Sequence, residues 1–283
     1  MNTKWYQRSS LRIAVTADLH YGITSSGTIA ALVDQIAAAQ CDVVLIAGDI
    51  GEPDDNFRKA LALFERLNIP RAIVAGNHDL WAGQYPSRHL WDDVLPHLAR
   101  RRGCCWLDAD SHVLDGVGIC GTIGWYDYSA KDPRLVDYDD SRYACEKARY
   151  NCDAIRIDWP TSDREFAAEV LAAFTERLAR LQNDPVVKQI IVVTHVPPFA
   201  EQIIRKPADD FFWNVNNAYF GNLALGRVIE QFGKVRLVVS GHTHVAVDAV
   251  HPCSDTPGAR TIRAITVGSQ YYQPRLEIID VDP

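Results

Sequence analysis

The chain has 283 residues, of which 47% are hydrophobic and 23% charged, a composition typical of an ordinary globular protein with a large core. Its formal net charge of −7 argues against nucleic acid and anionic membranes as partners, because both attract basic faces. There is no apolar run long enough for a membrane span or a signal peptide, and the seven cysteines lack disulfide-framework spacing, so we expect a cytoplasmic protein with reduced thiols.

Short runs rich in Val and Ile alternate with helical patterns in the first part of the chain. In chain order, the expected strands and the helices between them cover 12–17, 28–39, 42–47, 55–67 and 71–75. This β-α-β-α-β order predicts a parallel sheet with right-handed crossovers. A further helical pattern covers 87–101, where we expect Pro96 to kink or split the helix.

The second part of the chain mixes turn-rich strands with long helices. The segment 104–122 favours a hairpin in a second layer. Ser162 and Glu165 form a capping-box pattern at the start of the clearest helix, 161–182. Two buried strands (189–194, 236–240), a helix (222–232) and two short strands (264–268, 276–281) complete the expected elements. We expect one domain over 1–283, with an insertion at about 125–160.

A glycine pattern at Gly116, Gly118 and Gly121 matches the G-x-G-x-x-G fingerprint of dinucleotide-binding proteins. That motif binds pyrophosphate only when it opens a helix, and the residues that follow here lack helical periodicity. We therefore interpret it as a glycine-rich strand and not as a nucleotide site.

Each of the five buried strands is followed by side chains that can bind metal ions. The candidate ligands are Asp18, His20, Asp49, Asn77, His195, His242 and His244. The carboxyl ends of parallel strands lie side by side, so we expect these groups to converge on one edge. In an extended backbone His242 and His244 would also face the same side. A glycine precedes three of the blocks, which would let the backbone turn sharply near a bound ion.

Seven oxygen and nitrogen donors are too many for one tetrahedral ion. They suit two five- or six-coordinate ions that share a bridging carboxylate, a pair that can clamp both oxygens of a displacement at phosphorus. Imidazoles and carboxylates without thiolates favour Fe, Mn, Zn or Co over Ca. The sequence does not choose among these metals.

In this order, D-x-H, G-D, G-N-H-D, a lone histidine and G-H-x-H resemble the motifs of the calcineurin-like metallophosphoesterases. The resemblance covers 11–80 and 187–245. It implies an α/β fold in which two sheets form a β-sandwich flanked by helices, in four layers α/β/β/α. It also implies hydrolysis of a phosphate ester by a metal-bridging hydroxide. The implied ligands are Asp18, His20, Asp49 and His244 for the first ion and Asp49, Asn77, His195 and His242 for the second.

His78 is not needed as a ligand, because Asn77 already points towards the metal. An imidazole beside a phosphoryl group can protonate the leaving oxygen or stabilise the equatorial charge, and the family resemblance implies the same catalytic role. We expect Asp79 to hold the tautomer of His78, as carboxylates commonly do for functional histidines.

The expected substrate is a small phosphomonoester or phosphodiester. The segment Ile50-Gly51-Glu52-Pro53 lacks the arginine motif of the protein Ser/Thr phosphatases, which disfavours that branch. Two other classes stay open: a catalytically silent protein-binding scaffold, and an oxidoreductase with a similar dimetal centre. A scaffold need not retain every ligand and His78, whereas this chain has them all.

Substrate identity is expected to depend on the segment 125–160, as a lid in which Trp125 or Tyr126 stacks on the substrate. A solvated excursion with half-buried rings is an equal alternative. In the loop after His195, three side chains are weaker candidates for substrate contact: Arg205, Lys206 and Asn217. The sequence does not indicate an oligomeric state.

Overall fold

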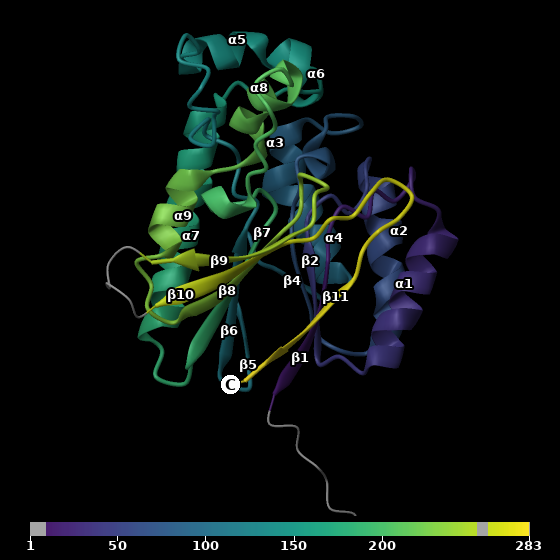
Figure 1. The fold of residues 1–283 in the computed structure, drawn as a ribbon. Helices are drawn as coiled ribbons and strands as arrows, with labels where there is room; N and C mark the ends of the chain where they lie inside the picture. Colours follow the sequence, from purple (N-terminus) through teal and green to yellow (C-terminus); the bar gives the residue numbers. More distant parts are fainter. Residues whose placement is uncertain (1–9, 254–259, 283) are drawn as a thin grey trace, which may run out of the picture.

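The computed structural model describes residues 10–253 and 260–282. Two mixed β-sheets lie face to face at its centre (Figure 1). The first sheet contains, in spatial order, β11 (Glu277–Val281), β1 (Leu11–Thr16), β2 (Val43–Ala47), β3 (Arg71–Val74) and β4 (Cys104–Trp106). The second contains β5 (His112–Leu114), β6 (Val117–Thr122), β7 (Gln189–Thr194), β8 (Val235–Ser240), β10 (Thr261–Thr266) and β9 (Val247–Pro252).

In each sheet most strands are parallel, and the antiparallel strands lie at the edges. Strands β1 to β4 are parallel, and β11 pairs antiparallel with β1. Strands β6, β7, β8 and β10 are parallel, with β5 and β9 antiparallel at the two edges. The carboxyl ends of the parallel strands therefore point towards the same end of the sandwich, the upper end in Figure 1.

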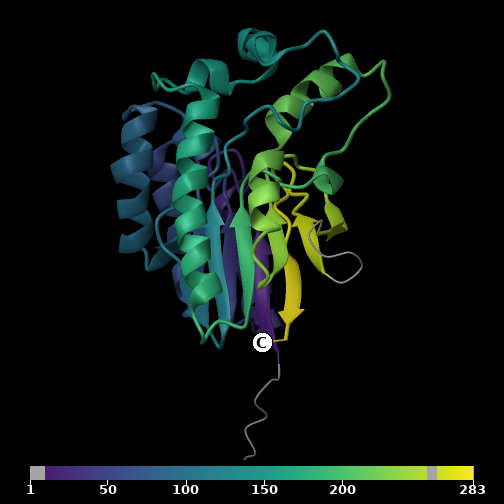
Figure 2. The same cartoon turned by 90° about the vertical axis from the view of Figure 1, so that its left-hand side faces the viewer.

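Helices cover both outer faces of the sandwich. On the first sheet lie α1 (Ser26–Ala39), α2 (Asp54–Phe64) with η1 (Glu65–Leu67), and α4 (Leu95–Arg101). Three short elements precede α4 in the chain: η2 (His78–Leu80), α3 (Ser87–His89) and the π-helical turn η3 (Leu90–Val94). On the second sheet lie α7 (Asp163–Asn183) and α9 (Leu223–Ile229); Figure 2 shows α7 running beside the strands. Ser162 and Glu165 form the expected capping box of α7.

The burial of the strands explains their nearly continuous apolar sequences. On β1, Ile13 and Val15 point into the core between the sheets, where they join Val193 of β7 and Val239 of β8, whereas Ala14 faces the helices. Strands buried on both faces have no solvent side and need no polar alternation. The expected two-sheet sandwich flanked by helices is confirmed.

A cap lies over the carboxyl ends of the strands. It consists of the segment 125–160, with α5 (Asp140–Tyr150) and α6 (Asp153–Arg156), together with α8 (Phe211–Phe220). The short η4 (Ala200–Gln202) packs against β9 and β10 of the second sheet. The cap packs around buried rings such as Tyr126 and Tyr143, which belong to the same hydrophobic cluster as α1 and α2. The single-domain organisation of 1–283 stays a prediction, and this shared core supports it.

The structure corrects several sequence expectations. Strand β4 lies in the first sheet, so only β5 and β6 form the expected second-layer hairpin. The five strands that precede the candidate ligands do not share one sheet: β1, β2 and β3 are in the first, and β7 and β8 are in the second. Their ends meet because the two sheets are stacked in the same direction. Strand β9 and helices α5, α6 and α8 were not expected.

Two negative expectations can also be compared with the structure. The glycine pattern begins at Gly116 in the turn before β6 and continues in β6, where Gly121 packs tightly against β3 and β7, and no helix follows it directly. Among the described residues, no helix combines the length and the apolarity that a bilayer crossing requires.

Candidate metal centre

The seven predicted ligands gather at the carboxyl ends of the strands, in the loops after β1, β2, β3, β7 and β8. Five of them have a left-handed backbone, with φ between 43° and 73°: Asp18, His20, Asp49, His242 and His244. This conformation is uncommon outside glycine and marks backbone strain at functional sites. The extended backbone expected for His242 and His244 is wrong, because β8 ends at Ser240 and both residues lie in the loop beyond it.

The glycines beside the ligands make room for side chains. A methyl group at Gly76 would overlap the Asp49 carboxylate, and one at Gly48 would overlap the His195 ring. A methyl group at Gly241 would lie 2.7 Å from the Asp18 carboxylate. Only Gly48 combines this crowding with a positive φ, of 84°. The glycines therefore permit close packing of the ligand side chains more than they permit sharp turns.

Asn77, His195 and His242 form one half of the site. The Asn77 Oδ1 lies 3.0 Å from His195 Nε2 and 3.1 Å from His242 Nδ1, and these two nitrogens are 3.2 Å apart. The other nitrogen of each ring donates to a backbone carbonyl at 2.8 Å: His195 Nδ1 to Ala47 and His242 Nε2 to Tyr219. Such backbone acceptors commonly fix the tautomer of metal-binding histidines.

This arrangement leaves three lone pairs directed at one another. Burial lowers the pKa of His195 to about 4 and also lowers the pKa of His242, so both rings are neutral at pH 7. A neutral imidazole has one N–H, and each of these is used on a carbonyl. Three acceptors within 3.2 Å of one another repel unless a cation lies between them. Donors at right angles around an ion at about 2.1 Å lie about 3.0 Å apart, so the residues fit a metal.

Asp18, His20 and His244 form the other half, and Asp49 lies between the two halves. His244 Nε2 is 3.8 Å from Asp18 Oδ1, and neither ring nitrogen of the buried His20 has a hydrogen-bond partner among the described residues. One Asp49 oxygen lies 3.5 Å from His195 Nε2, and the other lies 3.6 Å from His20 Nε2. Each oxygen of Asp49 thus faces one half, an arrangement that allows this carboxylate to bridge two ions.

The charges of the site also favour bound cations. Burial, together with repulsion from Asp49, raises the pKa of Asp18 well above its usual range. Burial would raise the pKa of Asp49 as well, but the surrounding histidines, led by His195, hold it below its usual range. Two neighbouring buried carboxylates are costly to ionise together unless positive charge lies beside them.

His78 lies at the edge of the site and contacts Glu52, not Asp79. Its Nδ1 is 3.3 Å from Glu52 Oε1, and its ring stacks on Trp81 with centroids 3.7 Å apart. Burial lowers the pKa of His78, but Asp49 and Glu52 outweigh this effect and raise it to about 9.

The expected contact of Asp79 with His78 is wrong. The Asp79 carboxylate accepts from the backbone N–H groups of Ile50, Gly51 and Gly76 at 2.8–2.9 Å, and so it joins the loops after β2 and β3. Glu52 also lies 3.8 Å from the Nδ1 of His20, so it faces both histidines. No local pattern in the sequence marks Glu52 as a partner of these histidines, because it stands 26 residues before His78.

The other candidates for substrate contact have different roles. Trp125 and Tyr126 are fully buried and donate to Asp163 and Asp153, so the expected stacking on substrate is wrong. Asn217 is also fully buried, in α8. Arg205 donates to the Ala130 carbonyl at 3.3 Å, and Lys206 pairs with Asp210 at 3.2 Å. Helix α8, which lies between His195 and His242 in the chain, instead supplies the Tyr219 carbonyl that accepts from His242.

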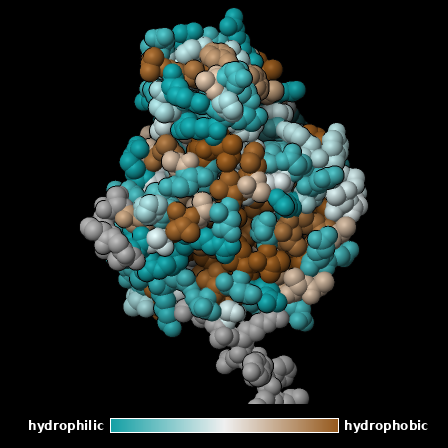
Figure 3. Space-filling model, in the orientation of Figure 1, coloured by the Kyte–Doolittle hydropathy of each residue, from teal (hydrophilic) through white to brown (hydrophobic). Residues whose placement is uncertain are grey.

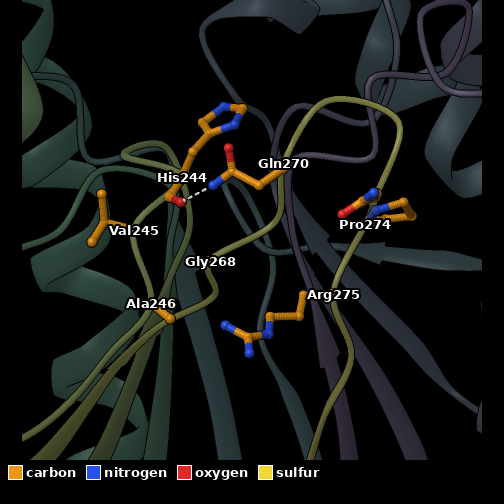
Figure 4. A pocket seen from close by; sticks show the side chains of 8 residues that line it. His244, Val245, Ala246, Gly268, Gln270, Pro274 and Arg275 are labelled. Atoms are coloured by element: carbon orange, nitrogen blue, oxygen red, sulfur yellow. Dashed lines mark hydrogen bonds between the residues drawn. The ribbon is translucent and has the colours of Figure 1, made fainter.

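An open groove of about 620 Å³ begins beside the site, at His244. Figure 4 shows His244 at its upper end and Arg275 at its lower end, with Gln270 donating to the His244 carbonyl. The exposed ring of Tyr271 stands over the site, with its centroid 4.7 Å from that of His20 and 4.9 Å from that of His244. Arg275 also lines a second, smaller hollow between β10 and β11, together with Ile265, Ile278 and Ile279. Figure 3 shows hydrophobic residues on this face of the molecule.

Comparison with known proteins agrees with this geometry. The family model of the calcineurin-like phosphoesterases matches residues 11–246. The chain therefore belongs to the calcineurin-like phosphoesterase family, whose members characteristically use a dimetal centre.

Solved structures with the same fold are distant in sequence. The phosphopantetheinyl hydrolase of Mycobacterium tuberculosis is 19% identical, with a TM-score of 0.66, over 95% of this chain and 96% of its own. A dimetal phosphatase from Danio rerio is 14% identical, with a TM-score of 0.56, over 95% and 91%. The protein TT1561 of Thermus thermophilus is 10% identical, with a TM-score of 0.55, over 96% and 99%. The comparison with curated protein sequences gives no match.

Proposed function

We propose that this protein is a metal-dependent hydrolase of a small phosphomonoester or phosphodiester. The observation that carries the proposal is the group of three mutually facing lone pairs on Asn77, His195 and His242, which needs a cation to be stable. Asp18, His20, Asp49 and His244 would hold a second ion, with Asp49 between the two. The donor set favours Mn, Fe or Zn.

Two bound ions would supply an activated water nucleophile and withdraw charge from the phosphoryl oxygens. The chain's own residues would do the rest. His78 lies beside the ligands on the exposed side and can donate a proton to the leaving oxygen. Glu52 orients that ring through its Nδ1, so that the other ring nitrogen can face the substrate. Tyr271 stands at the entrance and narrows it on the side of His20 and His244.

The groove supports a substrate with an organic leaving group. It starts at a ligand, its lining alternates polar side chains such as Gln270 and Gln273 with apolar ones such as Val245 and Pro274, and it ends at the cationic Arg275. A leaving group with hydroxyl, amide or acidic groups would match this lining. A nuclease is disfavoured by the acidic net charge. A cytoplasmic location belongs to the same proposal.

The test is reconstitution of metal-free protein with Mn²⁺, Fe²⁺ or Zn²⁺, followed by parallel assays on p-nitrophenyl phosphate and bis-p-nitrophenyl phosphate. A phosphopantetheinyl phosphodiester belongs in the same panel, because one structural neighbour is named as a hydrolase of that group. Turnover that requires metal supports the proposal, and the preferred substrate distinguishes a monoesterase from a diesterase. A protein that binds two ions per chain and hydrolyses none of these esters would favour the scaffold alternative. Redox turnover by a coloured iron form would favour the oxidoreductase.

A further inference from the structure

Asp153, the first residue of α6 in the cap, is a buried carboxylate connected to the metal centre. Its side chain is 1% exposed and accepts hydrogen bonds from three other side chains. Asn77 Nδ2 donates to its two oxygens at 2.9 and 3.1 Å, Trp81 Nε1 at 2.7 Å and Tyr126 Oη at 3.0 Å. Asp153 and Asn77 are 76 residues apart, and Asp153 is not among the candidate ligands.

The contact with Asp153 determines which end of the Asn77 amide faces the histidines. An asparagine amide has a donor end and an acceptor end, and a half-turn of the side chain exchanges them. Asp153 offers only acceptor oxygens to Asn77, because Oδ1 already accepts the Trp81 N–H and Oδ2 the Tyr126 O–H. The NH₂ group of Asn77 must therefore face Asp153, and the carbonyl oxygen must face His195 and His242. The reversed amide would present N–H groups where a cation needs a lone pair.

The same carboxylate also holds the aromatic support of His78. The Trp81 indole donates to Asp153, and its ring lies nearly parallel to the His78 imidazole, with 3.7 Å between centroids and 27° between planes. A stacked indole restricts the rotation of the imidazole about its χ2 axis. Asp153 thus fixes a ligand directly and the proposed acid through one intermediate ring.

The cap is attached to this part of the site by further bonds. The Ala82 N–H donates to the Arg156 carbonyl at 2.7 Å, and the Ser87 N–H donates to Asp158 Oδ1 at 2.8 Å. These bonds join α6 and the residues after it to the residue after Trp81 and to the start of α3. These bonds favour a supporting role of the cap over that of a freely moving lid.

We propose that Asp153 is a positioning residue by which the 125–160 insertion orients Asn77 for the second metal ion and Trp81 for His78. The inference rests on the proposed function for the role of His78, but its metal-binding half does not depend on any activity. Outer partners of ligands commonly change metal affinity by about 10–100-fold. We expect a loss in that range when the amide is no longer fixed.

The experiment compares Asp153→Asn with Asp163→Asn in Mn²⁺ titrations followed by calorimetry and metal analysis. Asp163 is the matched control, because it is a buried carboxylate at the start of α7 that accepts from the cap residues Trp125, Tyr128 and Lys147 but has no bond to Asn77. Asp153→Asn should weaken the second Mn²⁺ by about 10–100-fold and leave the first unchanged. Asp163→Asn should keep both affinities even if its melting temperature falls. Wild-type affinities in Asp153→Asn, or equal losses in both variants, would overturn the inference.

A reversed pair tests the orientation directly and covers the case in which Asp153→Asn folds poorly. In the double variant Asn77→Asp with Asp153→Asn, the amide at 153 donates to a carboxylate at 77, which again presents an oxygen to the ion. We expect the double variant to recover most of the second-ion affinity that Asn77→Asp alone loses by placing two carboxylates together. A double variant no better than Asn77→Asp would contradict the positioning role. If the wild-type protein binds two ions but hydrolyses no phosphate ester, the proposed function fails while these titrations still decide the inference.

Discussion

Replacement of Gly76 by alanine tests the crowded geometry of the candidate site without removing any ligand. The new methyl group would overlap Asp49 Oδ1 and would lie 2.7 Å from its Cγ, whereas ordinary contacts begin at 3.4 Å. The Asp49 carboxylate would have to move by about 0.7 Å at Cγ and by more than that at Oδ1, which exceeds the roughly 0.2 Å tolerance of metal–ligand distances. The backbone N–H of Asp49 is also too close to the methyl group, so a change of rotamer alone cannot relieve the clash.

We expect Gly76→Ala to lose at least one of two ions, and to lose turnover by about 100-fold or more even when saturated with metal. Overpacking should also lower the free energy of unfolding by about 1–3 kcal/mol. The assay is metal analysis after dialysis, followed by phosphoesterase kinetics in excess Mn²⁺. Gly83→Ala is the matched control, because a methyl group there meets no atom within 4 Å. Two tightly bound ions and wild-type turnover in Gly76→Ala would refute this account of the site.

Four further predictions follow from the same geometry. His78→Ala should keep both ions but lose turnover by about 10²–10⁴-fold, and an unchanged kcat in the metal-replete variant would reject its role as an acid. Asp49→Ala should bind fewer than two ions per chain by metal analysis, and a variant that still holds two would contradict the bridging assignment. Chelation of the metal should lower the melting temperature, and Mn²⁺ at 100 times its Kd should raise the free energy of unfolding again by about 2.7 kcal/mol. A melting temperature that does not change with metal would mean that the native state does not bind it. Arg275→Gln should raise KM for esters with an acidic leaving group but not for p-nitrophenyl phosphate, and equal effects on both would exclude an anion contact in the groove.

The positions of the candidate ligands were readable from the sequence because each lies directly after a local signal. A run such as Val43–Ala47 is apolar throughout, since the strand is buried on both faces, and it ends in Gly48 and Asp49. Such signals span fewer than ten residues and need no knowledge of the partner strand. The helices α1, α2 and α7 were predictable for the same reason, with a local cap at Ser162 for α7.

The split of the five ligand strands between two sheets was not readable in this way. Buried parallel strands look alike whichever sheet they join, so Gln189–Thr194 carries no mark that places it opposite β2 and not beside it. The order β11-β1-β2-β3-β4 depends on pairings such as Leu11 with Val281, at opposite ends of the described chain. The two-sheet arrangement was expected only from the family resemblance and not from the periodicity of the strands.

The sequence by itself determined which residue types stand at the ends of the strands, and so the chemistry that the site can hold. Only the tertiary structure decided how those residues are held: Glu52 beside His78, Asp153 behind Asn77, and the carbonyl of Tyr219 behind His242. The two members of each pair are separated by 23 to 76 residues of chain, and none of the three pairs stands in a local pattern. A buried carboxylate such as Asp153 looks like any solvated acidic residue until folding removes its water and leaves three donors around it.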